Sequence, residues 1–190
     1  MIELFASQNC QACPKAHRTL QSVAADNQDV LILTWSVDYW DYLGEADPMA
    51  TPEAKARQAA YAERMSLRAP YTPQSVYDGV KQCPATRRRT VDSHIEARRS
   101  AAGASKPSFQ QNENMVSVPN GCETPLDVLL IEYLPTEAHE TGMVNPVTSL
   151  RSLGACTKEQ KQFEFSCLQS CAVVLQEPGY GEVKSALVLQ

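Results

Sequence analysis

The chain has 190 residues and a formal charge of −5, from 17 Lys and Arg against 22 Asp and Glu. This length predicts one large domain or two small ones, and a hydrophobic content of 43% is enough for a buried core. The acidic balance argues against a nucleic-acid-binding protein, because contacts with phosphate groups favour an excess of Lys and Arg. No apolar run approaches the roughly 18 residues that a membrane-spanning helix needs, so we expect no membrane insertion.

The first half of the chain predicts strands that alternate with helices. Thr51 and Pro52 are residue types that favour the N-cap and the first position of a helix. Asp78-Gly79 is typical of a two-residue hairpin turn. From these signals and from apolar periodicity we predict, in chain order, a strand at 2–5, a helix at 11–25, a strand at 29–38, a helix at 52–65, strands at 71–77 and 80–83, and a helix at 85–102.

The second half predicts a mostly β region. Residues 104–114 are largely polar and lack an apolar period, so we place a linker there. It separates a domain at 1–103 from a smaller domain at 115–190 that packs on the first. Residues 146–153 could hold a helical turn. The predicted strands are 115–118, 126–134, 163–167, 172–177 and 183–189, the last two joined as a hairpin through Pro178-Gly179-Tyr180-Gly181.

Seven cysteines, an odd number, leave at least one thiol unpaired. Cys167 and Cys171 lead straight into a predicted strand, and we favour isolated thiols over a disulfide for them. Cys83, at the end of another predicted strand, is interpreted as a small buried hydrophobic residue. Cys10 and Cys13 form a Cys-x-x-Cys motif where a strand and a loop lead into a helix, and this context favours chemistry at the pair.

The position of Cys10 before a helix is suited to redox chemistry. Unpaired N–H groups and the helix dipole lower the pKa of a thiol at a helix N-terminus. We predict that the Cys10 thiolate attacks a substrate disulfide and that Cys13 displaces the mixed disulfide. A structural disulfide and half of a zinc site are the alternatives for the pair. His17, four residues after Cys13, could support the thiolate if protonated, but we interpret it as an ordinary packed or surface histidine.

The predicted order βαβαββα, the Cys-x-x-Cys motif and a proline near the start of the strand at 71–77 together resemble the thioredoxin fold. We therefore expect an α/β, thioredoxin-like fold followed by a smaller, mostly β C-terminal region. The resemblance implies that Pro73 follows a cis peptide bond and faces the dithiol. It also implies that Thr72 and Tyr71 flank the groove that binds the substrate.

Three segments, IELFASQNCQACP, VDYWDYLG and YTPQ, are similar to motifs of a bacterial thioredoxin-like family of unknown function. Members of that family are commonly exported. The start of this chain, in contrast, lacks the basic and apolar segments of a signal peptide, which predicts a cytoplasmic protein. A periplasmic location is the alternative if a leader has been removed.

Thioredoxins carry a buried carboxylate on the first strand as a proton acceptor, at the position where this chain has Leu4. Asp38 or Asp41, at the end of the strand at 29–38, are the candidate replacements. The alternative is that these acids cap the next segment through bonds to backbone N–H groups. Trp40 could form a wall of the substrate site, although packing is the more common role of such an aromatic residue.

These features predict a thiol–disulfide oxidoreductase that uses Cys10 and Cys13 on protein or small-molecule thiols and disulfides, without a cofactor or a resident metal. Two other functions remain open. The pair could hold a soft metal such as Cu(I) or Zn, or the protein could be a non-catalytic thioredoxin-like binding module. Pro73 favours the redox function, because a metal carrier has no reason to place a strand-opening proline after its second helix.

Overall fold

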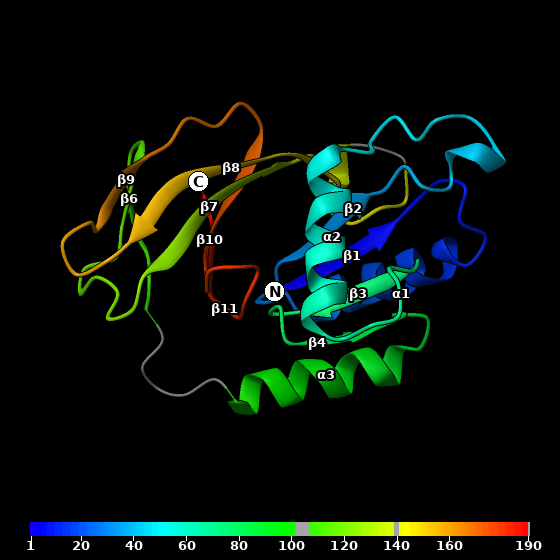
Figure 1. Cartoon of the computed structure of the whole chain (residues 1–190), viewed down its shortest axis with the longest axis horizontal. Coiled ribbons are helices and arrows are strands. Elements are labelled where there is room, and N and C mark those ends of the chain that lie inside the picture. Colours follow the sequence, from blue (N-terminus) through cyan, green and yellow to red (C-terminus); the bar gives the residue numbers. More distant parts are fainter. Residues whose placement is uncertain (102–106, 139–140, 190) are drawn as a thin grey trace.

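A computed structural model describes residues 1–101, 107–138 and 141–189, in which three α-helices accompany eleven β-strands arranged in three sheets (Figure 1). The order of elements in the first half is the predicted one. In chain order these are β1 (Ile2–Ala6), α1 (Cys13–Asp26), β2 (Ile32–Ser36), α2 (Pro52–Arg64), β3 (Gln74–Tyr77), β4 (Lys81–Cys83) and α3 (Arg88–Ala101), with a 3₁₀ turn at Asp41–Leu43 before α2.

The first sheet has the strand order β2-β1-β3-β4. Its strands β1 and β2 are parallel, whereas β3 is antiparallel to both β1 and β4. All five residues of β1 are buried, because successive side chains point to opposite faces and both faces are covered. Helices α1 and α3 cover one face and α2 covers the other. In the part of the chain that the structure describes, no helix is long and apolar enough to cross a membrane.

Two local sequence signals form the structures that they predict. The Thr51 hydroxyl accepts a hydrogen bond from the Ala54 backbone N–H at 3.2 Å, so Thr51 is the N-cap of α2. Asp78 and Gly79 have φ values of 46° and 73°, as the hairpin turn between β3 and β4 requires. A Cβ atom on Gly79 would lie 2.3 Å from the carbonyl oxygen of Gly181, so glycine here also permits the close approach of the C-terminal region.

The second half is built almost entirely from strands. Strands β7, β8, β10 and β11 form a four-stranded antiparallel sheet in the order β11-β10-β7-β8, and a smaller sheet has the order β5-β6-β9. The hairpin predicted through Pro178-Gly179-Tyr180-Gly181 is confirmed, since it joins β10 to β11. The strands are β5 (Gln110–Asn112), β6 (Met115–Ser117), β7 (Leu126–Tyr133), β8 (Val147–Cys156), β9 (Gln162–Glu164), β10 (Ser170–Gln176) and β11 (Val183–Val188), with a 3₁₀ turn at Thr136–Ala138.

The helical turn predicted within 146–153 is wrong, because most of these residues belong to strand β8. This strand pairs with β7 from Leu126 opposite Cys156 to Tyr133 opposite Val147. It is the edge strand of its sheet and most of its residues are partly or fully exposed. Its sequence therefore lacks the apolar alternation that marks a strand, and the pairing with β7 decides its conformation.

The segment predicted as a linker, 104–114, contains a strand. Its last residues include β5, which pairs with β6 through Gln110 opposite Ser117 and Asn112 opposite Met115. The residues of β5 are polar and mostly exposed, so no apolar pattern indicated a strand. Residues 102–106 lie outside the described residues, and with them the predicted end of the first domain at 103.

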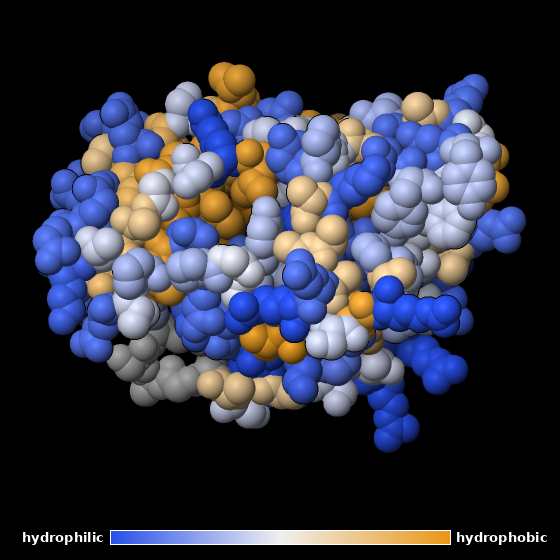
Figure 2. Space-filling view, viewed as in Figure 1, coloured by the Kyte–Doolittle hydropathy of each residue, from blue (hydrophilic) through white to orange (hydrophobic). Residues whose placement is uncertain are grey.

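The two halves share a hydrophobic core. Phe5 of β1 and Trp35 of β2 pack with Tyr61 of α2, and with Ile131 and Val174 of the larger C-terminal sheet. The opposite face of that sheet packs against the small sheet β5-β6-β9. Figure 2 shows a largely polar surface on which apolar side chains gather over the C-terminal sheet.

A buried ion pair lies in this shared core. The Arg57 guanidinium of α2, with no solvent exposure, pairs with the carboxylate of Glu3 on β1. Its Nη2 also donates to the Tyr61 hydroxyl at 2.8 Å and to Oε1 of Gln176 on β10 at 2.9 Å. The Tyr61 hydroxyl donates to Glu3 at 2.6 Å. Burial lowers the pKa of Arg57, but the charge of Glu3, the hydrogen bond to Glu3 and the neighbouring Tyr61 and Tyr180 together outweigh this and hold the pKa above its ordinary value.

The segment before β8 extends the first sheet along the free edge of β2. The Thr34 backbone N–H donates to the carbonyl oxygen of Asn145 at 3.1 Å, and the Thr34 hydroxyl donates to that of Val144 at 2.8 Å. Next to this contact, the Gln21 amide of α1 donates to the carbonyl oxygen of Gly142 at 2.9 Å. Residues 141–146 of the second half are thus held against β2 and α1 of the first.

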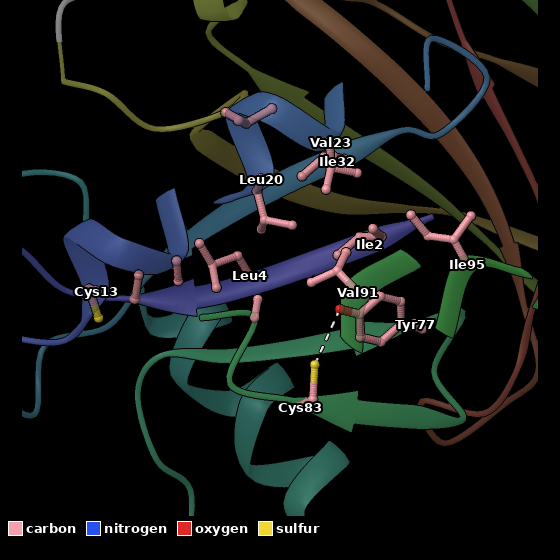
Figure 3. Close-up of a cluster of buried hydrophobic side chains, with 14 of the residues drawn as sticks. Ile2, Leu4, Cys13, Leu20, Val23, Ile32, Tyr77, Cys83, Val91 and Ile95 are labelled. Atoms are coloured by element: carbon pink, nitrogen blue, oxygen red, sulfur yellow. Dashed lines mark hydrogen bonds between the residues drawn. The ribbon is translucent and has the colours of Figure 1, made fainter. Parts of the chain in front are cut away.

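Six of the seven cysteines form disulfides, Cys10–Cys13, Cys122–Cys156 and Cys167–Cys171. The expectation of isolated thiols at 167 and 171 is therefore wrong, because the turn before β10 brings the two together. Cys83 is free and buried, as predicted, and it also contacts the hydroxyl of Ser75 and that of Tyr77, the second of which Figure 3 shows.

Replacement of Arg57 tests the buried ion pair. We expect Arg57→Met to lower the free energy of unfolding by about 3–5 kcal/mol, because it leaves the Glu3 carboxylate buried without its counter-ion. Urea denaturation without reductant measures this loss. Arg64→Met on the same helix is the control, since Arg64 is 45% exposed and lies 3.8 Å from Glu177; its effect should stay within about 0.5 kcal/mol. Equal effects of the two substitutions would contradict a special role for Arg57.

Candidate functional site

The Cys10–Cys13 disulfide lies where the chain enters α1. The Cys10 backbone N–H donates to the carbonyl oxygen of Ser7, and the Cys13 backbone N–H donates to the carbonyl oxygen of Cys10. These two bonds form a tight turn that leads into the helix. Helix α1 starts at Cys13 with Pro14 in its first turn, and it has neither a side-chain cap nor an acidic residue there. Its unpaired N–H groups and positive dipole end are therefore available to a thiolate. In the disulfide form Cys10 is 6% exposed and Cys13 is 1% exposed.

A second loop covers the residues that precede Cys10. The Gln8 backbone N–H donates to Oδ2 of Asp47 at 2.9 Å. The side-chain amides of Gln8 and Asn9 each donate to the carbonyl oxygen of Glu45, at 2.9 and 2.8 Å. Gly44 lies so close to Asn9 that a Cβ atom would be 2.6 Å from its side-chain oxygen. The loop at 44–47 thus holds the loop at 7–9, which leads directly to Cys10.

The predicted substrate-binding residues Trp40 and Thr72 lie together. The Trp40 indole N–H donates to the Thr72 hydroxyl at 2.7 Å, and its ring packs on the apolar cluster that contains both cysteines of the pair. The Thr72–Pro73 peptide bond is cis, as the resemblance implied, and Pro73 is buried. Tyr71 is half-buried; its carbonyl oxygen accepts from Gln58 at 2.8 Å, and burial raises the pKa of its phenol to about 12.

The two predicted proton acceptors make other contacts. Asp38 is exposed and pairs with Lys55 at 3.2 Å. Asp41 accepts a hydrogen bond from the Asp47 backbone N–H at 3.1 Å. Asp41 therefore has the capping contact that was the alternative to proton transfer, whereas the partner of Asp38 is the Lys55 side chain. Leu4, at the position where thioredoxins carry the acid, is fully buried in the apolar cluster with Cys13 and Leu20 (Figure 3).

A cavity of about 550 Å³ adjoins the disulfide on its Cys13 side. It lies between the first turns of α1, the loop at 47–49 and the segment at 141–143, which the contacts with β2 and α1 hold in place. Within the described residues, no three or more His, Cys, Asp and Glu side chains converge as a metal site would require. Beside Cys13, the lining residues that matter for chemistry are His17, Arg18, Asp47, Met49 and Met143.

His17 is the titratable group that the sequence interpretation set aside. It lies one helical turn after Cys13 and is partly buried, and its Nδ1 atom has no hydrogen-bond partner among the described residues. Burial lowers the pKa of His17 to about 4, although the charge of Asp47 opposes this shift. His17 is therefore neutral at pH 7. Because His17 follows Cys13 by four residues, the sequence indicated that the two share a helix face. Nothing in the sequence indicated that Asp47 and residues 141–143 line the same cavity as His17.

The shifted pKa of His17 predicts a pH dependence of stability. The folded protein binds this proton near pH 4 and the unfolded chain near pH 6.5, so stability is lost as the pH falls between these values. Between pH 7 and pH 4, we expect the free energy of unfolding of the wild type to fall by up to about 3 kcal/mol more than that of His17→Gln. Urea denaturation at several pH values measures the difference. His94→Gln is the matched control, because the less buried His94 should produce a smaller change. A parallel pH profile for wild type and His17→Gln would contradict the buried, neutral state.

Residues 1–163 match the model of a family described as "Protein of unknown function (DUF1223)". No curated protein matches the chain. An X-ray structure of a protein from Agrobacterium tumefaciens is similar, with a TM-score of 0.82 and 24% sequence identity, over 99% of this chain and 92% of that chain. At this identity the similarity concerns the fold alone. Since the family model spans most of its length, the chain belongs to the DUF1223 family of proteins of unknown function.

Proposed function

We propose that this protein is a thiol–disulfide oxidoreductase with a thioredoxin-like unit in its first half. The observation that carries the proposal is the disulfide between Cys10 and Cys13 at the uncapped N-terminus of α1. Reduction of this bond places a thiolate where helix N–H groups and the helix dipole stabilise it. The pair can then exchange electrons with another disulfide through a mixed disulfide, without a cofactor.

The Cys122–Cys156 disulfide provides a contrast. Cys122 and Cys156 are both buried, 34 residues apart, and they join the start of β7 to the end of β8 in the core of the C-terminal sheets. A bridge across so many residues restricts the unfolded chain, and we assign it a structural role. The Cys10–Cys13 bridge closes a very short loop, which gives little stability by that route. Stability is therefore a weak reason for the chain to contain it.

In the proposed mechanism the Cys10 thiolate attacks a substrate disulfide and Cys13 resolves the mixed disulfide. We propose that Pro73, Thr72 and Tyr71 form the groove for the substrate beside the pair, with Trp40 as its wall. The hydrogen bond from Trp40 to Thr72 supports this assignment, because it joins the two sides of such a groove.

The three disulfides also favour an oxidising compartment. Disulfides that include a buried structural bridge persist in exported bacterial proteins and are rare in the reducing cytosol. We therefore favour a periplasmic location over a cytoplasmic one.

A redox titration tests the proposed function. The purified protein is equilibrated with defined glutathione or dithiothreitol ratios, its thiols are trapped, and the modified cysteines are mapped by mass spectrometry. We expect a reversible two-electron transition confined to Cys10 and Cys13, at potentials where Cys122–Cys156 remains oxidised, and no such transition in Cys10→Ser or Cys13→Ser.

Two results would overturn the proposal. If Cys10 and Cys13 became accessible to the trapping reagent only after a chelator is added, the pair holds a soft metal. If the pair were reduced only together with Cys122–Cys156, it is a structural bridge and the domain is a non-catalytic binding module.

A further inference from the structure

The cavity beside Cys13 has the size of a small-molecule site. Its volume of about 550 Å³ falls in the range of roughly 300–1,000 Å³ that is typical of such sites. It belongs to the region of the proposed redox pair, but it lies on the Cys13 side, apart from Pro73 and Trp40, which do not line it.

A large partner has little access to the disulfide from outside. Cys10 is 6% exposed and Cys13 is 1% exposed, and both pack in the apolar cluster under α1. The loop at 44–47 is in addition bonded to the residues before Cys10. A small molecule needs no movement of that loop if it enters through the cavity that Cys13 lines. The shape of the site thus favours a small co-substrate on this side of the pair.

The charges around the cavity favour an anionic group on that co-substrate. Arg18 is exposed and makes no ion pair or hydrogen bond with any described residue, so its guanidinium is available to a ligand. The Asp47 carboxylate already accepts hydrogen bonds from the backbone N–H groups of Gln8 and Met49. His17 carries no charge at pH 7, because burial lowers its pKa to about 4.

The rest of the lining suits the sulfur end of such a molecule. Met49 and Met143 supply polarizable, apolar walls. His17 Nδ1, which lacks a partner, can make a hydrogen bond with the ligand.

We propose that this cavity binds a low-molecular-weight thiol that carries a carboxylate, with Arg18 holding the carboxylate and the ligand thiolate attacking Sγ of Cys13. The inference rests on the proposed oxidoreductase function and adds the class of its small co-substrate. It also assigns the point of attack for this co-substrate to Cys13, whereas Cys10 remains the group that attacks substrate disulfides.

In this reaction two ligand thiols reduce the Cys10–Cys13 disulfide. The ligand thiolate forms a bond to Cys13 Sγ, the Cys10–Cys13 bond breaks, and Cys10 leaves as a thiolate at the helix N-terminus. A second ligand thiolate attacks the ligand sulfur of the mixed disulfide and releases the Cys13 thiolate. Two thiols are oxidised to one disulfide, the protein disulfide is reduced to two thiols, and the protons that the ligands lost return to Cys10 and Cys13.

Three small thiols that differ in charge test the role of Arg18. The oxidised full chain is reduced with mercaptoacetate, mercaptoethanol or cysteamine, and each rate is divided by the rate of the same thiol with a small chromogenic disulfide. We expect corrected rates about fivefold higher for mercaptoacetate than for mercaptoethanol, and lowest for cysteamine. Arg18→Gln should abolish this preference, so that the three corrected rates become similar. Arg89→Gln, an exposed arginine on α3, should behave as the wild type.

Two further measurements test the cavity and the point of attack. Met49→Trp should fill the cavity and slow reduction by all three thiols several-fold, whereas Met65→Trp, at the end of α2, should not. In Cys10→Ser, Cys13 should form a mixed disulfide with the disulfide of mercaptoacetate faster than Cys10 does in Cys13→Ser.

The possible outcomes separate the two proposals. If the pair cycles but the three corrected rates are equal, and Arg18→Gln changes none of them, the co-substrate site is wrong and the oxidoreductase function stands. Faster labelling of Cys10 than of Cys13 would overturn the assigned point of attack. If none of the thiols reduces the pair at potentials where Cys122–Cys156 stays oxidised, both proposals fail.

Discussion

The need to pair the buried Arg57 charge is the constraint on which the rest of the structure depends. An unpaired guanidinium in the core would cost several kcal/mol, so its partners must all be in place when the chain is folded. Two of those partners come from distant parts of the sequence, Glu3 on β1 and Gln176 on β10, whereas Tyr61 lies one turn along the same helix α2. The Trp35 and Tyr180 rings lie within 5.7 Å of the guanidinium and complete its surroundings. The ion pair therefore aligns the first sheet, α2 and the C-terminal sheet with one another.

This alignment has a consequence for the candidate site. When the C-terminal sheet lies on the first, the residues before β8 reach the free edge of β2, where Thr34 binds Val144 and Asn145. The next residues back along the chain, 141–143, then form one wall of the cavity beside Cys13. The β region thus supplies part of the site, which gives it a role beyond stabilising the first half. Its removal would open the Cys13 side of the disulfide to solvent.

The proposed redox chemistry of Cys10 and Cys13 depends on which charged groups lie near the start of α1. The first turn of α1 has no acidic residue, and the nearby position of Leu4 is apolar, so no carboxylate opposes a thiolate at Cys10 from these positions. His17 is held neutral by burial. Of the charged groups that line the cavity with Cys13, Arg18 is exposed and Asp47 is bonded to the backbone of the loop before Cys10.

The sequence by itself determined the features that depend on neighbouring residues. The strand, loop and helix around Cys10 and Cys13, the N-cap at Thr51 and the turn at Asp78-Gly79 were all predictable, because each depends on residues within one turn of chain. Only the tertiary structure decided the features that depend on distant partners. Strand β8 lies at an edge of its sheet and exists through its pairing with β7. Strand β5 and the Cys167–Cys171 disulfide depend on nearby residues, but no apolar pattern indicated the polar β5 and no local motif indicated the disulfide. The cavity with His17, Asp47 and residues 141–143 has no signal in the sequence, because long-range contacts bring its three walls together.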